Sequence, residues 1–87
     1  MTSHNAQVIR MSFPSELGHE KVAAVVTGLT AEAIGFSPEK RDDIKTSVAE
    51  ACTNAIEHGN ACDSTTDVEV VVTVKNDHLS IKVIDSG

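Results

Sequence analysis

Two runs of alternating apolar and polar residues near the end of the chain most constrain its fold. Residues 67–74, DVEVVVTV, and residues 79–85, LSIKVID, both have an apolar residue at every second position. In an extended strand these apolar side chains share one face. Between them, Asn76 and Asp77 are typical residues of a tight hairpin turn. The sequence therefore predicts an antiparallel hairpin with one apolar face, and that face needs a covering layer.

A first strand and a first helix are predicted before this hairpin. Residues 8–13, VIRMSF, alternate in character and indicate a short strand. Ser15 is a good N-cap for a helix that follows, and Gly35 is a natural residue to end it. The predicted apolar face of this helix has helical spacing and consists of Gly18, Val22, Val25, Val26, Leu29 and Ala33.

A second helix is predicted directly afterwards. Ser37 is its expected N-cap, with Pro38 in the first helical position, and the helix runs to about His58, where Gly59 ends it. Advancing each residue by about 100° gathers one apolar arc that should face the core. That arc consists of Ile44, Val48, Ala51, Cys52 and Ala55.

The order strand, helix, helix, strand, strand favours an α+β fold with two layers, in which the helices cover one face of a mixed or antiparallel sheet. The 87 residues suffice for a single domain, 1–87, with one small core. Because the chain has two Phe and no Tyr or Trp, that core must consist mainly of Val, Ile, Leu and Ala.

Composition and charge narrow the classes of function. The net charge is −6 and Lys and Arg form no run, which argues against direct binding to nucleic acid or to an anionic membrane. No stretch of eighteen apolar residues and no signal-peptide pattern is present. Cys52 and Cys62 lack metal-ligand or CxxC spacing, so we expect free thiols in a cytoplasmic protein.

Polar residues on the second helix form a second arc, roughly 110° from the apolar one on the same wheel. The arc consists of Ser47, Glu50, Asn54 and His58. On geometry alone, a half-exposed helix side with ordinary polar residues is the simpler explanation, and a groove between helix and sheet is the alternative. Asp85 favours the groove, because strand alternation places it in phase with the apolar face, where a carboxylate needs a partner. The alternative is that the strand ends there and DSG makes a turn.

The amino-acid sequences of these segments resemble motifs of a known family. EACTNAIEHGN, residues 50–60, resembles the N-box of the GHKL ATPases, and VIDSG, residues 83–87, resembles the start of their D-x-G box. The closest likeness is to bacterial anti-sigma factors that are serine/threonine protein kinases. This resemblance covers about 8–87 and implies a Bergerat-type ATPase fold, a two-layer α/β sandwich that is incomplete at its C-terminus.

The resemblance also implies roles for individual residues. Glu50 corresponds to the general base that orients a protein serine hydroxyl, and Asn54 to the ligand of Mg²⁺ beside the ATP phosphates. Asp85 corresponds to the acceptor for the adenine amino group, and Gly87 to the glycine that lets the backbone approach the base. His58 matches a position beside the nucleotide, although a His at a helix C-terminus also suits the helix dipole.

The function implied is an anti-sigma factor serine kinase that binds Mg-ATP, sequesters a sigma factor and phosphorylates an anti-anti-sigma factor. Homodimers are common in the family, and the last strand offers an apolar edge for self-association. Alternatives are a non-catalytic binding module of the same fold, the ATP-binding part of a sensor histidine kinase, or a domain without a ligand. Because family members continue beyond the D-x-G box with an ATP lid, we expect the 87 residues alone to bind ATP weakly or not at all and to be inactive.

Overall fold

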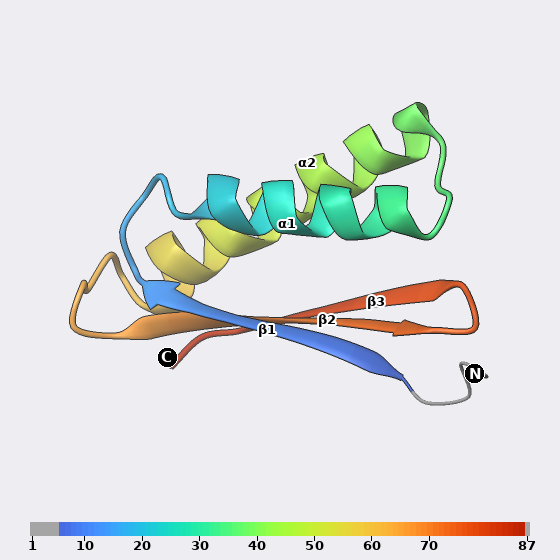
Figure 1. Ribbon diagram of the computed structural model, residues 1–87. Helices are drawn as coiled ribbons and strands as arrows, with labels where there is room; N and C mark the ends of the chain where they lie inside the picture. Colours follow the sequence, from blue (N-terminus) through green and yellow to red (C-terminus); the bar gives the residue numbers. More distant parts are fainter. Residues whose placement is uncertain (1–5, 87) are drawn as a thin grey trace.

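A computed structural model describes residues 6–86 and contains one antiparallel sheet (Figure 1). Its strands are β1 (Gln7–Pro14), β2 (Asp67–Lys75) and β3 (His78–Ile84), in the order β1-β2-β3. Both pairings are antiparallel, with β2 in the centre. Within the described residues β1 and β3 are therefore the edge strands, as the sequence predicted for the last strand.

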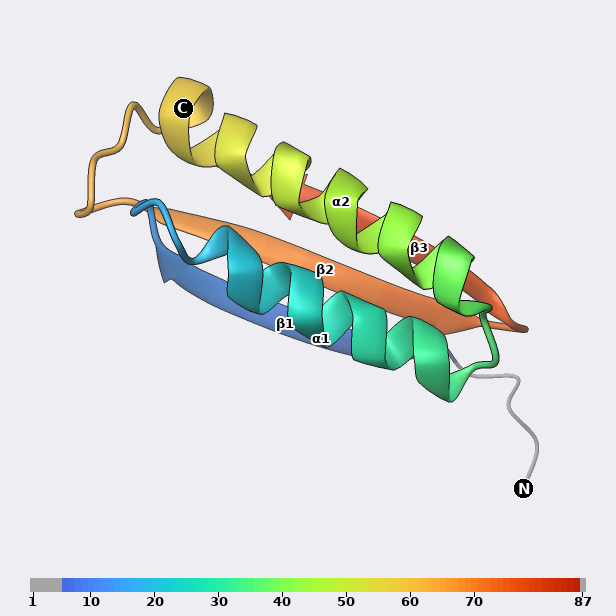
Figure 2. The ribbon, with the colours of Figure 1, turned by 90° about the horizontal axis from the view of Figure 1, so that it is seen from above.

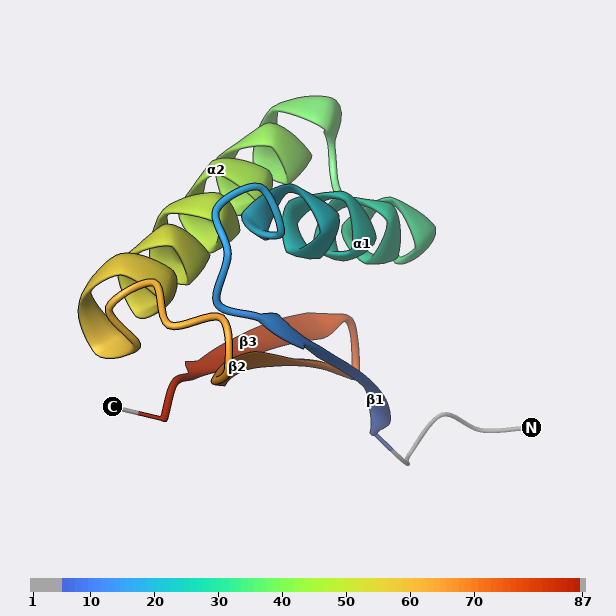
Figure 3. The same cartoon turned by 90° about the vertical axis from the view of Figure 1, so that its left-hand side faces the viewer.

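The second layer consists of two helices on one face of the sheet (Figures 1 and 3). They are α1 (Glu20–Ala33) and α2 (Pro38–Asn54), and α2 continues without a break into a π-helical turn, η1 (Ala55–Gly59). This arrangement confirms the predicted α+β sandwich and its order of elements. Neither helix of the described region combines the length and the apolar character needed to cross a bilayer.

The predicted hairpin forms the centre of the core. Val68, Val70 and Val72 are fully buried, and Leu79, Ile81 and Val83 pack against them from β3. Helix residues complete the same cluster: Ala23, Val48, Cys52, Ala55 and Ile56. Asn76 and Asp77 both have positive φ, as a tight hairpin turn of the predicted kind requires.

The signals between the two helices were read correctly. Ser37 caps α2, and its hydroxyl oxygen accepts a hydrogen bond from the Lys40 amide at 3.2 Å. At the end of α1, Gly35 has a φ of +94° and the Phe36 amide donates to the Ala31 carbonyl at 3.0 Å. These contacts satisfy helix ends that would otherwise leave polar backbone groups unpaired.

The predicted start of the first helix was wrong. α1 begins at Glu20 with His19 as its N-cap, and Ser15 is no cap. Ser15 is completely buried, and its amide and hydroxyl groups both donate to the Thr66 carbonyl, at 3.0 and 3.1 Å. A residue suited to capping forms a tertiary contact here, because β1 continues through Pro14 and leaves Ser15 beside the segment that enters β2.

The predicted apolar face of α1 was also wrong. Val22, Val25 and Leu29 are 52–60% exposed. The buried face consists of small residues at equally good helical spacing: Ala23, Ala24, Thr27, Gly28 and Ala31. Small residues let α1 lie close beside α2 (Figure 2), since a Cβ at Gly28 would come within 2.7 Å of the Lys45 side chain.

On α2 the predicted core arc is confirmed except at Ala51, which is exposed. Val48, Cys52 and Ala55 are buried, and Ile44 is partly buried. The described sheet ends at β3, the strand that α2 contacts. A shallow hollow of about 320 Å³ near this edge is lined by Lys40, Asp43, Ile44, Ser47 and Ile81.

Candidate functional site

The polar flank of α2 leads into an altered helical turn. The predicted helix does extend to Gly59, but its last five residues are π-helical. The Asn60 amide donates to the Ala55 carbonyl, five residues back, at 2.8 Å. In this wider turn the four-residue spacing no longer places His58 directly above Asn54, and the His58 side chain is exposed. π-turns of this kind often occur at functional sites.

Glu50 and Asn54 lie together on one open hollow. Its volume is about 490 Å³, and the other lining residues are Glu20, Lys21, Ala49 and Thr53. Glu50 and Asn54 are both exposed, so the carboxylate and the amide are accessible to a ligand and are not buried in the core. The start of α1 forms the opposite wall with one acidic and one basic residue. This side of α2 can therefore present oxygen atoms to a bound ligand.

Asp85 meets the end of the same helical run. It follows β3 directly, and a Cβ built on Gly59 would overlap the Asp85 carboxylate and lie 2.9 Å from the Asp85 Cβ. The absence of a side chain at Gly59 makes this approach possible. The predicted phase is confirmed, since Asp85 faces the helix layer, but its side chain is exposed and not buried. Gly87 lies outside the described residues.

The structure thus groups the candidate residues in two places on one helical run. Glu50 and Asn54 lie on its side, and Asp85 lies at its end against Gly59. Asn54 and Gly59 are five residues apart, which corresponds to roughly 7 Å along a helix axis. The two places are therefore close along the helix axis, but Asp85 is not among the residues that line the hollow of Glu50 and Asn54.

Sequence reasoning missed the residue that links these segments. Asn60 is 6% exposed and hydrogen-bonds to Ser15, Asp67 and Ser86. These contacts join residues that lie 7 to 45 positions apart in the chain. A single polar residue behind a helix-ending glycine has no periodic pattern, so nothing in the sequence distinguishes it from an ordinary loop residue.

The pKa is shifted for two side chains, the Cys52 thiol and the Asp63 carboxyl. Burial, with a smaller contribution from the Glu20 carboxylate, raises the pKa of the Cys52 thiol to about 11. Cys52 is buried and Cys62 is exposed, and both are free thiols as predicted. Hydrogen bonds from the Thr65 hydroxyl and amide lower the pKa of Asp63 in the loop after η1. The raised pKa of the Cys52 thiol is the opposite of the lowered pKa that a nucleophilic cysteine needs.

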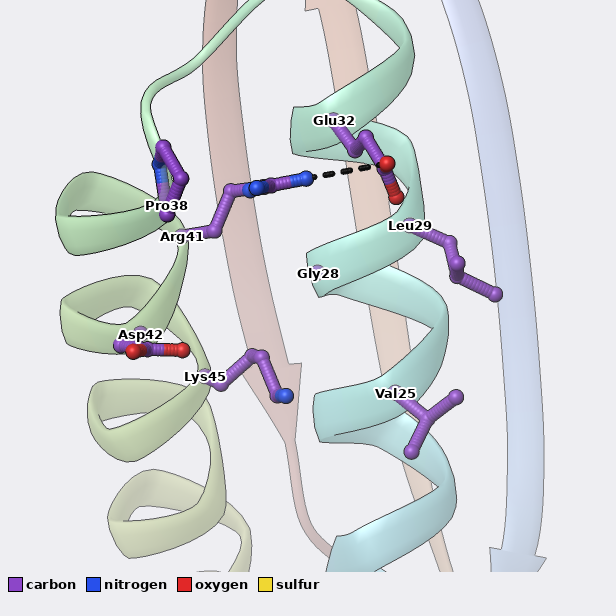
Figure 4. A pocket seen from close by; sticks show the side chains of 8 residues that line it. All are labelled: Val25, Gly28, Leu29, Glu32, Pro38, Arg41, Asp42 and Lys45. Atoms are coloured by element: carbon purple, nitrogen blue, oxygen red, sulfur yellow. Dashed lines mark ion pairs between the residues drawn. The ribbon is translucent and has the colours of Figure 1, made fainter.

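A separate hollow of about 260 Å³ lies between α1 and α2 (Figure 4). The Arg41 guanidinium spans it to the Glu32 carboxylate at 3.1 Å. Its other lining residues are Val25, Gly28, Leu29, Pro38, Asp42 and Lys45. None of the residues that the sequence singled out for chemistry lines this hollow, so it is distinct from the candidate site.

Comparison with known families agrees with this architecture and with the N-box wording. The family model described as histidine kinase-like ATPase domain matches residues 13–87. The chain therefore belongs to the histidine kinase-like ATPase domain family.

The curated relatives that this chain resembles include serine-protein kinases and anti-sigma factors. The serine-protein kinase RsbW of Bacillus licheniformis is 34% identical over 94% of this chain and 51% of its own length. That of Bacillus subtilis (strain 168) is 30% identical over 97% of this chain and 52% of its own length. An anti-sigma F factor of Clostridium perfringens is 35% identical over 91% of this chain and 56% of its own length. The chain spans about half the length of these relatives.

Proposed function

We propose that this chain carries part of the nucleotide site of an anti-sigma factor that is a serine protein kinase. The observation that supports this most strongly is the meeting of Asp85 with Gly59 at the end of the helical run that bears Glu50 and Asn54. Segments 50–60 and 83–87 are remote in sequence, and both had been singled out by their wording. Their proximity is what a site between the N-box and the D-x-G box requires.

The described residues fit ATP with Mg²⁺ as the ligand. Between residues 6 and 86 no cluster of three or more His, Cys, Asp or Glu could hold a metal ion by itself. Mg²⁺ is commonly bound by one or two protein oxygen atoms together with phosphate oxygens, so the exposed amide oxygen of Asn54 is a suitable single ligand. When bound, Mg²⁺ supplies positive charge that neutralises the phosphate oxygens.

Each residue then has a definite task. The Asp85 carboxylate accepts a hydrogen bond from the adenine amino group, and Gly87 lets the backbone lie close to the base. Glu50, one helical turn before Asn54, accepts the proton of the serine hydroxyl that is to be phosphorylated. His58, at the helix C-terminus, contacts the phosphate side of the nucleotide.

The proposed partners follow from the named relatives. We propose a sigma factor as the protein that is sequestered, an anti-anti-sigma factor as the phosphorylated protein, and the cytoplasm as the place of action. We also propose a homodimer, which is supported by exposed apolar residues on α1 and β1, among them Leu29, Val25 and Val8. Light scattering should give twice the monomer mass; a monomeric mass at high concentration would contradict the dimer.

The test of catalysis is transfer of radiolabelled phosphate from ATP to an anti-anti-sigma protein, in the longest form of the protein that the cell makes. We expect transfer in the wild type and a loss of at least about a hundredfold in Glu50→Gln, the range over which general bases act. Glu32→Gln, on a different hollow, is the matched control and should retain activity. Partner binding without any transfer would instead indicate the non-catalytic module.

A further inference from the structure

Four separate segments meet at Asn60, and its amide group bonds to three of them. The Asn60 Nδ2 donates to the Ser15 hydroxyl at 2.8 Å and to the Asp67 carbonyl at 3.0 Å. The Asn60 Oδ1 accepts from the Ser86 amide at 2.8 Å. Thr66 holds Ser15 from the other side. We call Asn60, Ser15, Thr66, Asp67 and Ser86 the Asn60 cluster.

The orientation of the Asn60 side chain in this cluster has only one solution. The Asp67 carbonyl can only accept a hydrogen bond, so the amide nitrogen of Asn60 must face it. The amide oxygen then faces the Ser86 backbone, whose N–H can only donate. Since Asn60 is 6% exposed and Ser15 is fully buried, water has little access to replace these bonds.

The cluster fixes the residue that follows Asp85. Gly59 leaves room for the Asp85 carboxylate, and the next residue, Asn60, holds the Ser86 amide. Two consecutive residues of the N-box segment thus fix two consecutive residues of the D-x-G segment. Asp85 itself is exposed, so burial does not fix its position.

We propose that Asn60 is a positioning residue for base recognition: through the Ser86 amide it holds Asp85 where its carboxylate can accept a hydrogen bond from an adenine amino group. This inference rests on the proposed nucleotide site and adds to it a residue that does not touch the nucleotide. Asn60 acts on recognition of the base, and the N-box residues Glu50 and Asn54 act at the phosphate end.

The test compares two diphosphates that differ at the base. Adenosine diphosphate carries the amino group that Asp85 would recognise, and inosine diphosphate carries a carbonyl oxygen in its place. Affinities for the longest form of the protein that the cell makes are measured by NMR titration with Mg²⁺ present, which reads weak and tight binding alike. Wild type should prefer the adenine form. In Asn60→Ala this preference should fall by about fivefold, the effect of one hydrogen bond, with inosine diphosphate affected by less than about twofold.

Ser15→Ala is the matched control. It removes a hydrogen bond from the same buried cluster, but it leaves the Asn60 contact with Ser86 in place. A purely structural role for the cluster would make both variants lose stability and lower the affinity for both nucleotides equally. Under the proposal, Ser15→Ala keeps the wild-type preference for the adenine form, and only Asn60→Ala increases the hydrogen-exchange rate of the Ser86 amide.

Ser86→Pro provides a second variant should Asn60→Ala fail to fold. It removes the donor to Asn60 without changing a buried side chain, since Ser86 is exposed. It should reduce the adenine preference in the same way. An unchanged preference in the folded variants would overturn this inference and leave the proposed function standing. A wild-type protein of the longest form that takes up neither nucleotide would overturn both.

Discussion

The contact between Gly59 and Asp85 gives the sharpest test of the site's geometry. A Cβ at Gly59 would overlap the Asp85 carboxylate, and it would also lie 2.9 Å from the Asp85 Cβ, closer than real Cβ contacts. Overpacking of this kind costs about 1–3 kcal/mol. Ala is favoured over Gly by about 1 kcal/mol in an ordinary helix, which offsets part of that cost. We therefore expect Gly59→Ala to destabilise the fold by about 1 kcal/mol in net terms.

The same substitution should behave differently when the Asp85 carboxylate is absent. In an Asp85→Gly background neither the carboxylate nor the Cβ remains, so Gly59→Ala should lose its overpacking cost and stabilise the fold by up to about 1 kcal/mol. Urea unfolding followed by circular dichroism at 222 nm measures all four members of this cycle. An equal effect of Gly59→Ala in both backgrounds would refute the close approach of the two segments.

Three further outcomes are expected outside the candidate site. Ala61 has a φ of 51°, so Ala61→Gly should stabilise the fold by about 0.5–1 kcal/mol in urea unfolding, and a loss of stability would contradict the left-handed turn. A thiol reagent should modify Cys62 quickly and Cys52 only on unfolding; two fast thiols would refute the burial of Cys52. Because the pKa of Asp63 is lowered, its stabilising contribution is present at neutral pH and disappears as the pH falls below 3.8 through that lowered value. Wild type should therefore lose more stability on acidification than Asp63→Asn does, and equal losses would refute this.

The parts of the fold that the sequence predicted correctly are those fixed by local chemistry. The alternation in residues 67–85 determined the hairpin and its inner face, because a period of two admits one burial pattern. Ser37 and Pro38 marked the start of α2, because a cap acts on the nearest amides. The N-box wording located Glu50 and Asn54, and the structure brings both to one hollow.

The errors arose where tertiary contacts override local preference. On α1 two faces have helical spacing, one with the larger residues Val22, Val25 and Leu29 and one with small residues. The face with the small residues is the buried one. The Lys45 side chain leaves no room for a side chain at Gly28, and this close packing of the helices outweighs the apolar area that the larger residues would bury.

Polar tertiary contacts were missed for a related reason. Ser15 and Asn60 have partners 45 or more positions away in the chain, and no pattern within one segment encodes such a bond. The π-turn Ala55–Gly59 likewise has no distinguishing sequence pattern, since the same residues suit an α-helix.

The central claim is that an adenine nucleotide binds along the helical run from Glu50 to Gly59 and reaches Asp85. Titration of the ¹⁵N-labelled protein, in the longest form that the cell makes, with adenosine diphosphate and Mg²⁺, followed by NMR, tests it most directly. We predict shifts of the amides of residues 50–60 and 85–86, with the affinity reduced at least about tenfold in Asp85→Ala, the loss of a hydrogen bond to a charged group. Shifts confined to the hollow around Gly28, Arg41 and Lys45, or no shifts at millimolar nucleotide, would contradict the account.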